Sequence, residues 1–178
     1  MKKLINKTII LSLFVALTGC NDWLDVSPKA DMKAEDLFGT EAGFRDALVG
    51  VYALMCGTNS YGRDLTYGYL DVLAQYYNSP LKTTSSGYEH NFKNAAEYKY
   101  TEKTEESRIS SIWSNHFSAV ANINQAMLFI DENKGVFTSP EVHDVYKGEF
   151  LALRAFLHFD ILRLFAPSAA MNNNKGLD

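Results

Sequence analysis

Apolar residues at helical spacing fill most of residues 105–165 and strongly constrain the fold. In the first of two stretches, about 105–132, they recur every three or four positions. The second stretch begins with Ser139 as N-cap and Pro140 at the first helical position, and it extends to about Phe165. We therefore predict two long helices joined by a short turn, in a mostly helical, all-α protein. The first stripe comprises Ile109, Ile112, Trp113, His116, Phe117, Val120, Ile123, Met127 and Ile130.

The second of these helices is apolar on most of its sides. The fifteen residues from Leu151 to Phe165 include four polar ones, Arg154, His158, Asp160 and Arg163. Such a helix must be covered on more than one side, and the small, polar residues 168–178 offer no cover. We interpret the two helices as a helical-hairpin repeat that buries its surface only by stacking on other repeats. The sequence therefore predicts an interrupted chain.

The middle of the chain has weaker signals. A helix is expected over 41–56, with Thr40 as N-cap and with Gly50 at a close approach of a neighbouring helix. Residues 66–77 also fit a helix, although this one is short and rich in tyrosine. No period survives over 78–104, so we expect a long loop that contains at most a short strand at 98–101. A loop of this length inside a compact domain usually carries function.

The N-terminus has the features of a bacterial lipoprotein signal. A lysine-containing stub precedes an apolar run from Ile9 to Leu17, and the chain continues Thr18-Gly19-Cys20. Leu-Thr-Gly-Cys is a lipobox, in which the cysteine thiol is acylated and the preceding peptide is removed. We predict a signal peptide over 1–19, lipidation at Cys20 and an exposed tether over 20–40. A second domain boundary is not expected, so 41–178 would form one helical unit.

The net charge argues against nucleic-acid binding, and the cysteine content excludes an intramolecular disulfide. Three of the 17 basic residues lie before Cys20, so 14 basic and 21 acidic residues remain in the mature chain, a net charge of −7. This acidic balance argues against binding to nucleic acid. After lipidation of Cys20 only Cys56 remains, so no intramolecular disulfide is possible. We interpret Cys56 as a small, half-buried apolar residue.

Catalytic and metal-binding motifs are missing from the sequence, so we predict neither an enzyme nor a cofactor nor a metal site. The histidines are scattered, and His116 and His158 on apolar helices fit satisfied core positions. The pair Glu105-Glu106 fits a solvated helix start. Arg154, Asp160 and Arg163 fit an internal ion-pair set, with Asp160 and Arg163 at i and i+3, and the alternative for Arg154 is a binding role. The four histidines are His90, His116, His143 and His158.

Several segments, in order, resemble one protein family. The lipobox cysteine is followed by Asp22-Trp23-Leu24-Asp25-Val26-Ser27-Pro28-Lys29, and Glu35-Asp36-Leu37-Phe38 precedes the expected helix at 41–56. The strongest match is the segment from Glu149 to Phe165, with its Leu153-Arg154-Ala155-Phe156 centre. Ala166 stands where a glycine is usual. Together these segments resemble the SusD/RagB-type lipoproteins of Bacteroidetes.

The resemblance implies a function and a set of site residues. It implies a mostly helical, incomplete SusD-like fold with tetratricopeptide-like helix pairs and long loops, of which this chain would be the N-terminal part. It also implies an outer-membrane lipoprotein on the cell surface that captures oligosaccharides and hands them to a TonB-dependent (SusC-like) transporter. In the family, sugar-stacking aromatic residues lie between the early helices and the long helix. The corresponding region here offers Tyr76, Tyr77, Asn78, Tyr88, Asn91 and Tyr98, and we select Tyr76, Tyr77, Asn78 and Tyr88 as the candidate site residues. For Tyr76 and Tyr77, a place in the core is equally compatible with the sequence.

Other functions fit the same residues. One is a lipid-anchored helical-repeat scaffold that binds protein rather than sugar. Another is a surface enzyme whose catalytic part lies beyond Asp178. A third is a truncated, non-functional fragment, for which the uncovered helix 151–165 would be an aggregation risk.

Overall fold

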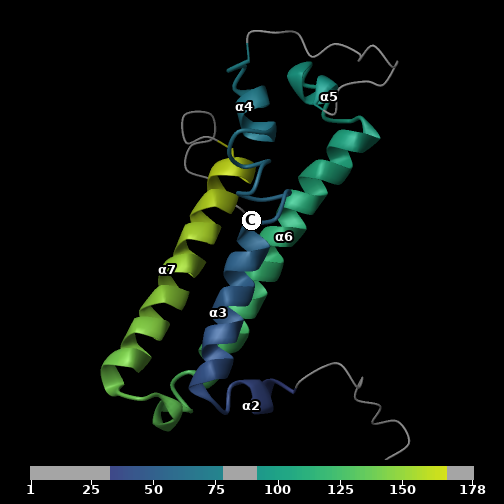
Figure 1. The fold of residues 1–178 in the computed structure, drawn as a ribbon. Coiled ribbons are helices and arrows are strands. Elements are labelled where there is room, and N and C mark those ends of the chain that lie inside the picture. The colour runs from purple at the N-terminus through teal and green to yellow at the C-terminus, as the bar shows by residue number, and fades with distance from the viewer. Residues whose placement is uncertain (1–32, 78–91, 168–178) are drawn as a thin grey trace, which may run out of the picture. The chain divides into compact units, whose positions relative to one another are not determined.

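The computed structural model describes residues 33–77 and 92–167, and all the elements in these ranges are helical (Figure 1). The described residues contain no strand, which confirms the all-α prediction. The signal peptide, Cys20 and most of the expected tether lie outside them, as do Asn78 and Tyr88. No described helix is long and apolar enough to cross a membrane. The elements are α2 (Ala34–Leu37), α3 (Glu41–Met55), α4 (Tyr69–Leu73), α5 (Lys93–Ala96), α6 (Lys103–Phe129), the 3₁₀ turn η1 (Lys134–Val136) and α7 (Pro140–Phe165).

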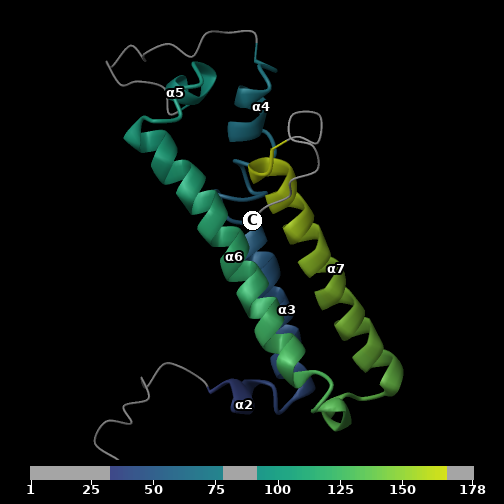
Figure 2. The ribbon, with the colours of Figure 1, turned by 180° about the vertical axis from the view of Figure 1, so that it is seen from behind.

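Three long helices, α3, α6 and α7, lie side by side and form what we call the three-helix body (Figures 1 and 2). Their starts follow the sequence signals. The Thr40 Oγ1 accepts a hydrogen bond from the Gly43 N–H at 3.1 Å, and the Ser139 Oγ accepts one from the Val142 N–H at 3.4 Å. Each cap satisfies a backbone N–H that has no partner within its helix.

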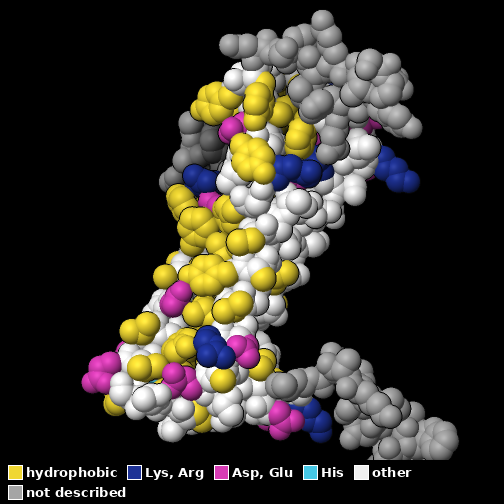
Figure 3. Space-filling model, in the orientation of Figure 1, with side chains coloured by type: hydrophobic (Ala, Val, Ile, Leu, Met, Phe, Trp, Pro, Cys, Tyr) yellow, Lys and Arg dark blue, Asp and Glu magenta, His cyan; other side chains and the backbone are white. Residues whose placement is uncertain are grey.

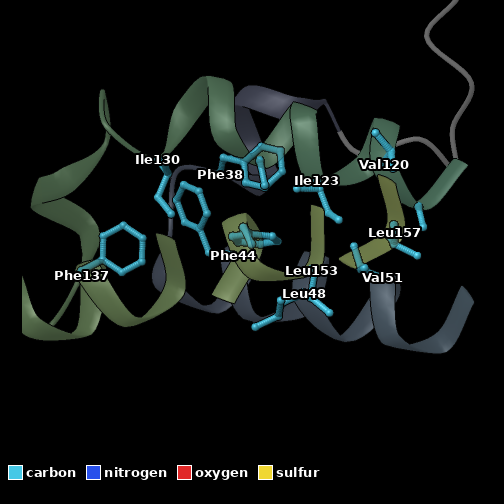
Figure 4. Packing of buried hydrophobic residues seen from close by; sticks show 13 residues of the cluster. Phe38, Phe44, Leu48, Val51, Val120, Ile123, Ile130, Phe137, Leu153 and Leu157 are labelled. Carbon is cyan, nitrogen blue, oxygen red and sulfur yellow. The ribbon is translucent and has the colours of Figure 1, made fainter. Parts of the chain in front are cut away.

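The core of the body is a continuous apolar cluster drawn from all three helices (Figure 4). Phe44 from α3, Ile123 from α6 and Phe150 from α7 are fully buried. Burying a side chain of this size contributes about 1.5–3 kcal/mol. The cluster comprises Phe38, Phe44, Leu48, Val51, Ala119, Val120, Ile123, Ala126, Ile130, Phe137, Phe150, Leu153 and Leu157.

The last residues of the expected tether are part of this core. Phe38 is 2% exposed, and its ring lies 5.0 Å from that of Phe44 and 5.2 Å from that of Phe129. The chain turns tightly between α2 and α3, since a Cβ on Gly43 would lie 1.6 Å from the Leu37 carbonyl oxygen. The segment from Ala34 to Thr40 is therefore anchored to the helical body through Phe38, while Glu35, Asp36, Gly39 and Thr40 stay exposed.

Some local predictions in the middle of the chain were wrong. The helix expected over 66–77 is confined to Tyr69–Leu73, because turns occupy the residues on both sides of it. The long loop contains the short helix α5, and Tyr98–Thr101 forms turns rather than a strand. A single short strand has no neighbour with which to pair there. A Cβ on Gly50 would find open space, so none of the helices that the structure describes approaches it closely.

The uncovered side of α7 matches the sequence prediction. Leu151, Phe156, Phe159 and Leu162 are all exposed, by 38–56% of their surface. Figure 3 shows hydrophobic side chains gathered on the side of α7 and around α4, whereas the surface over α6 is largely free of them. An apolar helix face of this extent calls for a covering partner.

Candidate functional site

Exposed tyrosines gather around α4 and α5, at one end of the three-helix body. Their rings come from the turn before α4, from the residues after it, and from the turns between α5 and α6. Each keeps 47–76% of its surface exposed. We call this region the tyrosine-rich end, and its members are Tyr67, Tyr76, Tyr77, Tyr98 and Tyr100.

Hydrogen bonds to the backbone hold three of these side chains. The Tyr98 hydroxyl donates to the Leu73 carbonyl oxygen at 2.9 Å, the Tyr67 hydroxyl donates to that of Gly62 at 2.9 Å, and the Tyr77 hydroxyl donates to that of Tyr67. The Gln75 amide donates to the carbonyl oxygens of Val72 and Ala96, both at 3.2 Å, and so connects α4 with α5. These three hydroxyls thus hold their rings in place while the rings stay open to solvent.

Beside these tyrosines are two adjoining hollows that share Tyr100. One, of about 320 Å³, is lined by Leu65, Tyr69, Leu70, Leu73, Tyr100, Ile109, Ile112, Leu164 and Phe165. The other, of about 480 Å³, is lined by Tyr100, Glu106, Ile109, Ser110, Trp113 and Phe165. Both have the size of a small-molecule site. The Trp113 ring stands edge-on to that of Phe165 at 4.9 Å, so α7 contributes to this wall.

Below the tyrosines lies a cluster of buried charges. The Asp64 carboxylate is fully buried and forms ion pairs with Arg63 at 2.7 Å and with Arg108 at 3.4 Å. Arg108 also lies 3.5 Å from the Glu105 carboxylate and 4.5 Å above the Phe92 ring. The cluster fastens the turn before α4 and the residue before α5 to the start of α6.

Glu105 was expected at a solvated helix start, and this was wrong. Its side chain is fully buried beside Arg108, and burial raises the pKa of its carboxyl group. Burial also raises the pKa of Tyr69 to about 12, with a further contribution from the charge of Glu105. Glu106 is exposed, as predicted. The helix pattern gave no sign that a turn from residues 60–68 would cover Glu105.

A second polar network joins the turn before α4 to α6 and α7. The Tyr61 hydroxyl donates to Asp160 at 2.6 Å and lies 3.3 Å from the His116 Nε2. Arg163 pairs with Asp160 at 2.8 Å, as predicted. Burial and the bond to Asp160 raise the pKa of Tyr61. His116 is thus a satisfied core histidine.

The surroundings of His158, Cys56 and Arg154 differ from those predicted. His158 faces solvent rather than the core, because neighbouring residues of a helix point about 100° apart and Leu157 takes the buried position. Cys56 is exposed rather than half-buried, since it follows the last residue of α3. The Arg154 side chain donates to the Asn124 Oδ1 at 3.1 Å, so it links α7 to α6 and lies outside the Asp160–Arg163 ion pair.

The chemistry of this end favours binding. Within residues 33–77 and 92–167, no three His, Cys, Asp or Glu side chains gather in a way that could hold a metal ion. In the second hollow, Glu106 and Ser110 are the polar lining residues and the others are apolar or aromatic. Aromatic walls with few polar groups are typical of a site that holds a ligand by stacking and shape.

The predicted site residues have different outcomes. Tyr76 and Tyr77 lie at the surface, with 76% and 48% of their area exposed, which excludes a place in the core. Asn78 and Tyr88 lie outside the described residues. Sequence reasoning missed Tyr100 and Trp113. Trp113 fits the apolar stripe of its helix, and only the position of Phe165 shows that it also lines a hollow.

This chain belongs to the SusD-like family described as starch-binding and associating with the outer membrane, whose sequence profile matches residues 22–176. Among individual proteins, it is 28% identical to SusD-like protein P2 of Formosa agariphila over 162 residues. That alignment covers 89% of this chain and 29% of the relative, so the chain spans less than a third of the relative's length. No solved structure matches the chain.

Proposed function

We propose that the protein is a cell-surface lipoprotein that captures oligosaccharides and hands them to a TonB-dependent, SusC-like transporter of the outer membrane. The anchor would be an acylated Cys20 after removal of residues 1–19. The observation that carries the sugar-binding part is the set of exposed tyrosines at the tyrosine-rich end, three of which are hydrogen-bonded to the backbone. The family description, starch-binding and associating with the outer membrane, supports the same function.

The tyrosines suit pyranose rings for a physical reason. The C–H face of a sugar packs on an aromatic face, and planar amides and hydroxyls bond its hydroxyl groups. Rings that are already fixed lose little conformational freedom on binding, so more of the stacking energy appears as affinity. Tyr76 and Tyr77 would provide stacking faces, and Asn78 and Tyr88 would complete the site from the neighbouring segment.

Capture followed by release requires reversible binding. The described residues around the hollows supply no paired carboxylates for cleavage of a glycosidic bond. We therefore infer a carrier role, in which the bound oligosaccharide leaves unchanged. Residues 41–178 would form the N-terminal part of the SusD-like domain, and further ligand contacts would come from the rest of a longer chain.

The test uses the natural full-length gene product from residue 21 onward, without the signal peptide and the lipidated cysteine, and isothermal titration with maltoheptaose. Because each aromatic contact contributes about 0.5–1.5 kcal/mol, the double variant Tyr76→Ala/Tyr77→Ala should bind about tenfold to a hundredfold more weakly. Tyr52→Ala is the matched control, an exposed tyrosine of α3 that is remote in sequence from this end. If the unsubstituted protein, the double variant and Tyr52→Ala all bind maltoheptaose equally well, Tyr76 and Tyr77 are not part of the site.

A protein-binding scaffold is the second candidate function. The exposed apolar residues of α7 favour it, since such a face can hold another helix. If the full-length protein binds no oligosaccharide in a broad panel, and instead forms a stable complex through α7, the scaffold function would replace the one proposed above. An unstable natural product that binds no oligosaccharide and forms no complex would favour the non-functional alternative.

A further inference from the structure

A buried hydrogen-bond network joins the turns before α4, residues 57–68, to the three-helix body. Tyr61 lies in these turns, His116 on α6 and Asp160 on α7. The Tyr61 hydroxyl donates to the Asp160 Oδ2 at 2.6 Å and lies 3.3 Å from the His116 Nε2. His116 and Asp160 are 1% and 5% exposed, so water has little access to these contacts. The hydrogens of the network must therefore come from its own groups.

The Tyr61 hydroxyl supplies one hydrogen, and Asp160 accepts it. Burial and the bond to Asp160 raise the pKa of Tyr61, so the hydroxyl keeps its hydrogen. Arg163 pairs with the Asp160 Oδ1 at 2.8 Å, and an ionised carboxylate accepts hydrogen bonds but donates none. The 2.6 Å distance is typical of a hydroxyl that donates to a carboxylate. The Tyr61 oxygen thus presents a lone pair, not a hydrogen, to His116.

His116 faces an acceptor at each of its ring nitrogens. The Nδ1 lies 2.9 Å from the Ile112 carbonyl oxygen, which can only accept, and the Nε2 faces the Tyr61 oxygen. Both contacts need an N–H of the imidazole ring. A neutral imidazole carries one N–H, whereas the imidazolium carries two. The protonated ring therefore completes the network, and the neutral ring leaves one of the two contacts without a hydrogen.

The charged surroundings of the network come from α7. The charges of Asp160 and Arg163 act on the Tyr61 hydroxyl. Helix α3 has no charged residue after Asp46, and α6 has none between its Arg108 and the end of the helix. The other titratable or charged groups on the adjoining parts of these elements bond elsewhere or face solvent, and they are Tyr52, Cys56, Arg63, Asp64, Arg108, Glu149, Arg154 and His158.

We propose that His116 is a pH-sensitive switch that holds the turns before α4 against α6 when its ring is protonated. The Nε2–H then donates to the Tyr61 oxygen. As the pH rises, this proton passes to water and the contact with α6 is lost, while Tyr61 keeps its bond to Asp160. The same turns carry Leu65, which lines the first hollow, so the switch acts on a wall of that hollow. The switch does not depend on the sugar-binding proposal.

Hydrogen exchange of the natural full-length gene product, from residue 21 onward, tests the switch. The rates at pH 5.5 and pH 8.5 are compared after correction for the intrinsic effect of pH on exchange. Residues 57–68 should exchange about threefold to tenfold faster at pH 8.5, the factor for the loss of one hydrogen bond. This rise should disappear in His116→Gln, whose amide does not titrate, and in Tyr61→Phe.

Matched variants separate the switch from other groups. His158→Gln and Tyr52→Phe should keep the rise, since His158 faces solvent and the Tyr52 hydroxyl donates to Glu149. Glu105→Gln should also keep it, because Glu105 contacts Arg108 and not this network.

A second measurement uses the unsubstituted protein and does not require the variants to fold. ¹⁵N NMR of labelled histidines shows how many ring nitrogens carry hydrogen, and contacts with Tyr61 identify His116. His116 should carry two ring hydrogens at pH 5.5 and one, on Nδ1, at pH 8.5. Its midpoint should match that of the exchange in residues 57–68.

Three results would overturn the proposal. The first is equal corrected exchange of residues 57–68 at both pH values. The second is a rise that persists in folded His116→Gln or Tyr61→Phe. The third is a His116 ring with the same protonation state at pH 5.5 and pH 8.5.

Discussion

The three-helix body and the tyrosine-rich end are built by different means. The body buries thirteen apolar residues between long, regular helices. The end has a smaller apolar cluster of Leu65, Tyr69, Val72, Ala95 and Ile112, and beneath it the buried charges of Asp64, Glu105 and Arg108. Burial of apolar surface therefore stabilises the body, whereas the end depends on a few polar contacts of fixed geometry.

This difference assigns separate roles to the two regions. Side chains that pack well in the body are hidden from any ligand, but five tyrosines at the end keep their rings exposed. Helix α6 belongs to both regions, since Ile123 lies in one cluster and Ile112 in the other. The three-helix body can thus support an aromatic surface whose own apolar cluster is small.

The largest expected change in the free energy of unfolding comes from a substitution in the three-helix body. Phe44→Ala should lower the free energy of unfolding by about 3–5 kcal/mol, because it leaves a cavity among Phe38, Phe137 and their neighbours. Urea denaturation followed by circular dichroism measures the change. Phe159→Ala, on the solvent side of α7, should cost less than about 1 kcal/mol in the 178-residue chain. Similar losses of unfolding free energy in Phe44→Ala and Phe159→Ala would mean that the body has no distinct core.

The second largest expected loss of stability comes from a substitution at the tyrosine-rich end. Arg108→Met should cost about 3 kcal/mol, because it leaves Glu105 buried without its cation and removes one partner of Asp64. Hydrogen exchange should rise in α4 and α5 and stay low in the second half of α6. Uniformly faster exchange would show that the two regions unfold as one unit.

The buried carboxyl group of Glu105 gives a smaller, pH-dependent effect. Because its pKa is raised in the folded protein, the protonated form is favoured by folding, and this contribution is present at acidic pH. It should be lost as the pH rises from the ordinary value of glutamate through the raised folded value. Glu105→Gln should remove this decline, as followed by the denaturation midpoint between pH 4 and pH 7. A parallel decline in the variant would assign the pH dependence to other groups.

The smallest effect distinguishes two glycines of α3. Gly50→Ala should stabilise the protein by about 1 kcal/mol, since its surroundings are open and alanine favours helix. Gly43→Ala should destabilise it, because the new Cβ would collide with the backbone of Leu37. Thermal unfolding of both variants checks the pair. A loss of stability in Gly50→Ala would indicate that another helix does approach this position in the complete protein.

Sequence reasoning succeeded where one periodicity decides the outcome. The caps Thr40 and Ser139 and the start of α7 at Pro140 are local signals, and the structure confirms them. The end could not be predicted in the same way, since α5 is too short to show a period. Burial of Asp64 and Glu105 depends on contacts between segments far apart in sequence, and so does the meeting of Trp113 with Phe165.

The central claim is that ligand binds at the tyrosine-rich end while the body serves as its support. Hydrogen exchange of the full-length protein, with and without maltoheptaose, tests this most directly. We predict slower exchange in residues 66–77 and 93–101 when the sugar is present, with α3 and α7 unchanged. Protection confined to α3 or α7, or no change in any segment at a saturating sugar concentration, would contradict the claim.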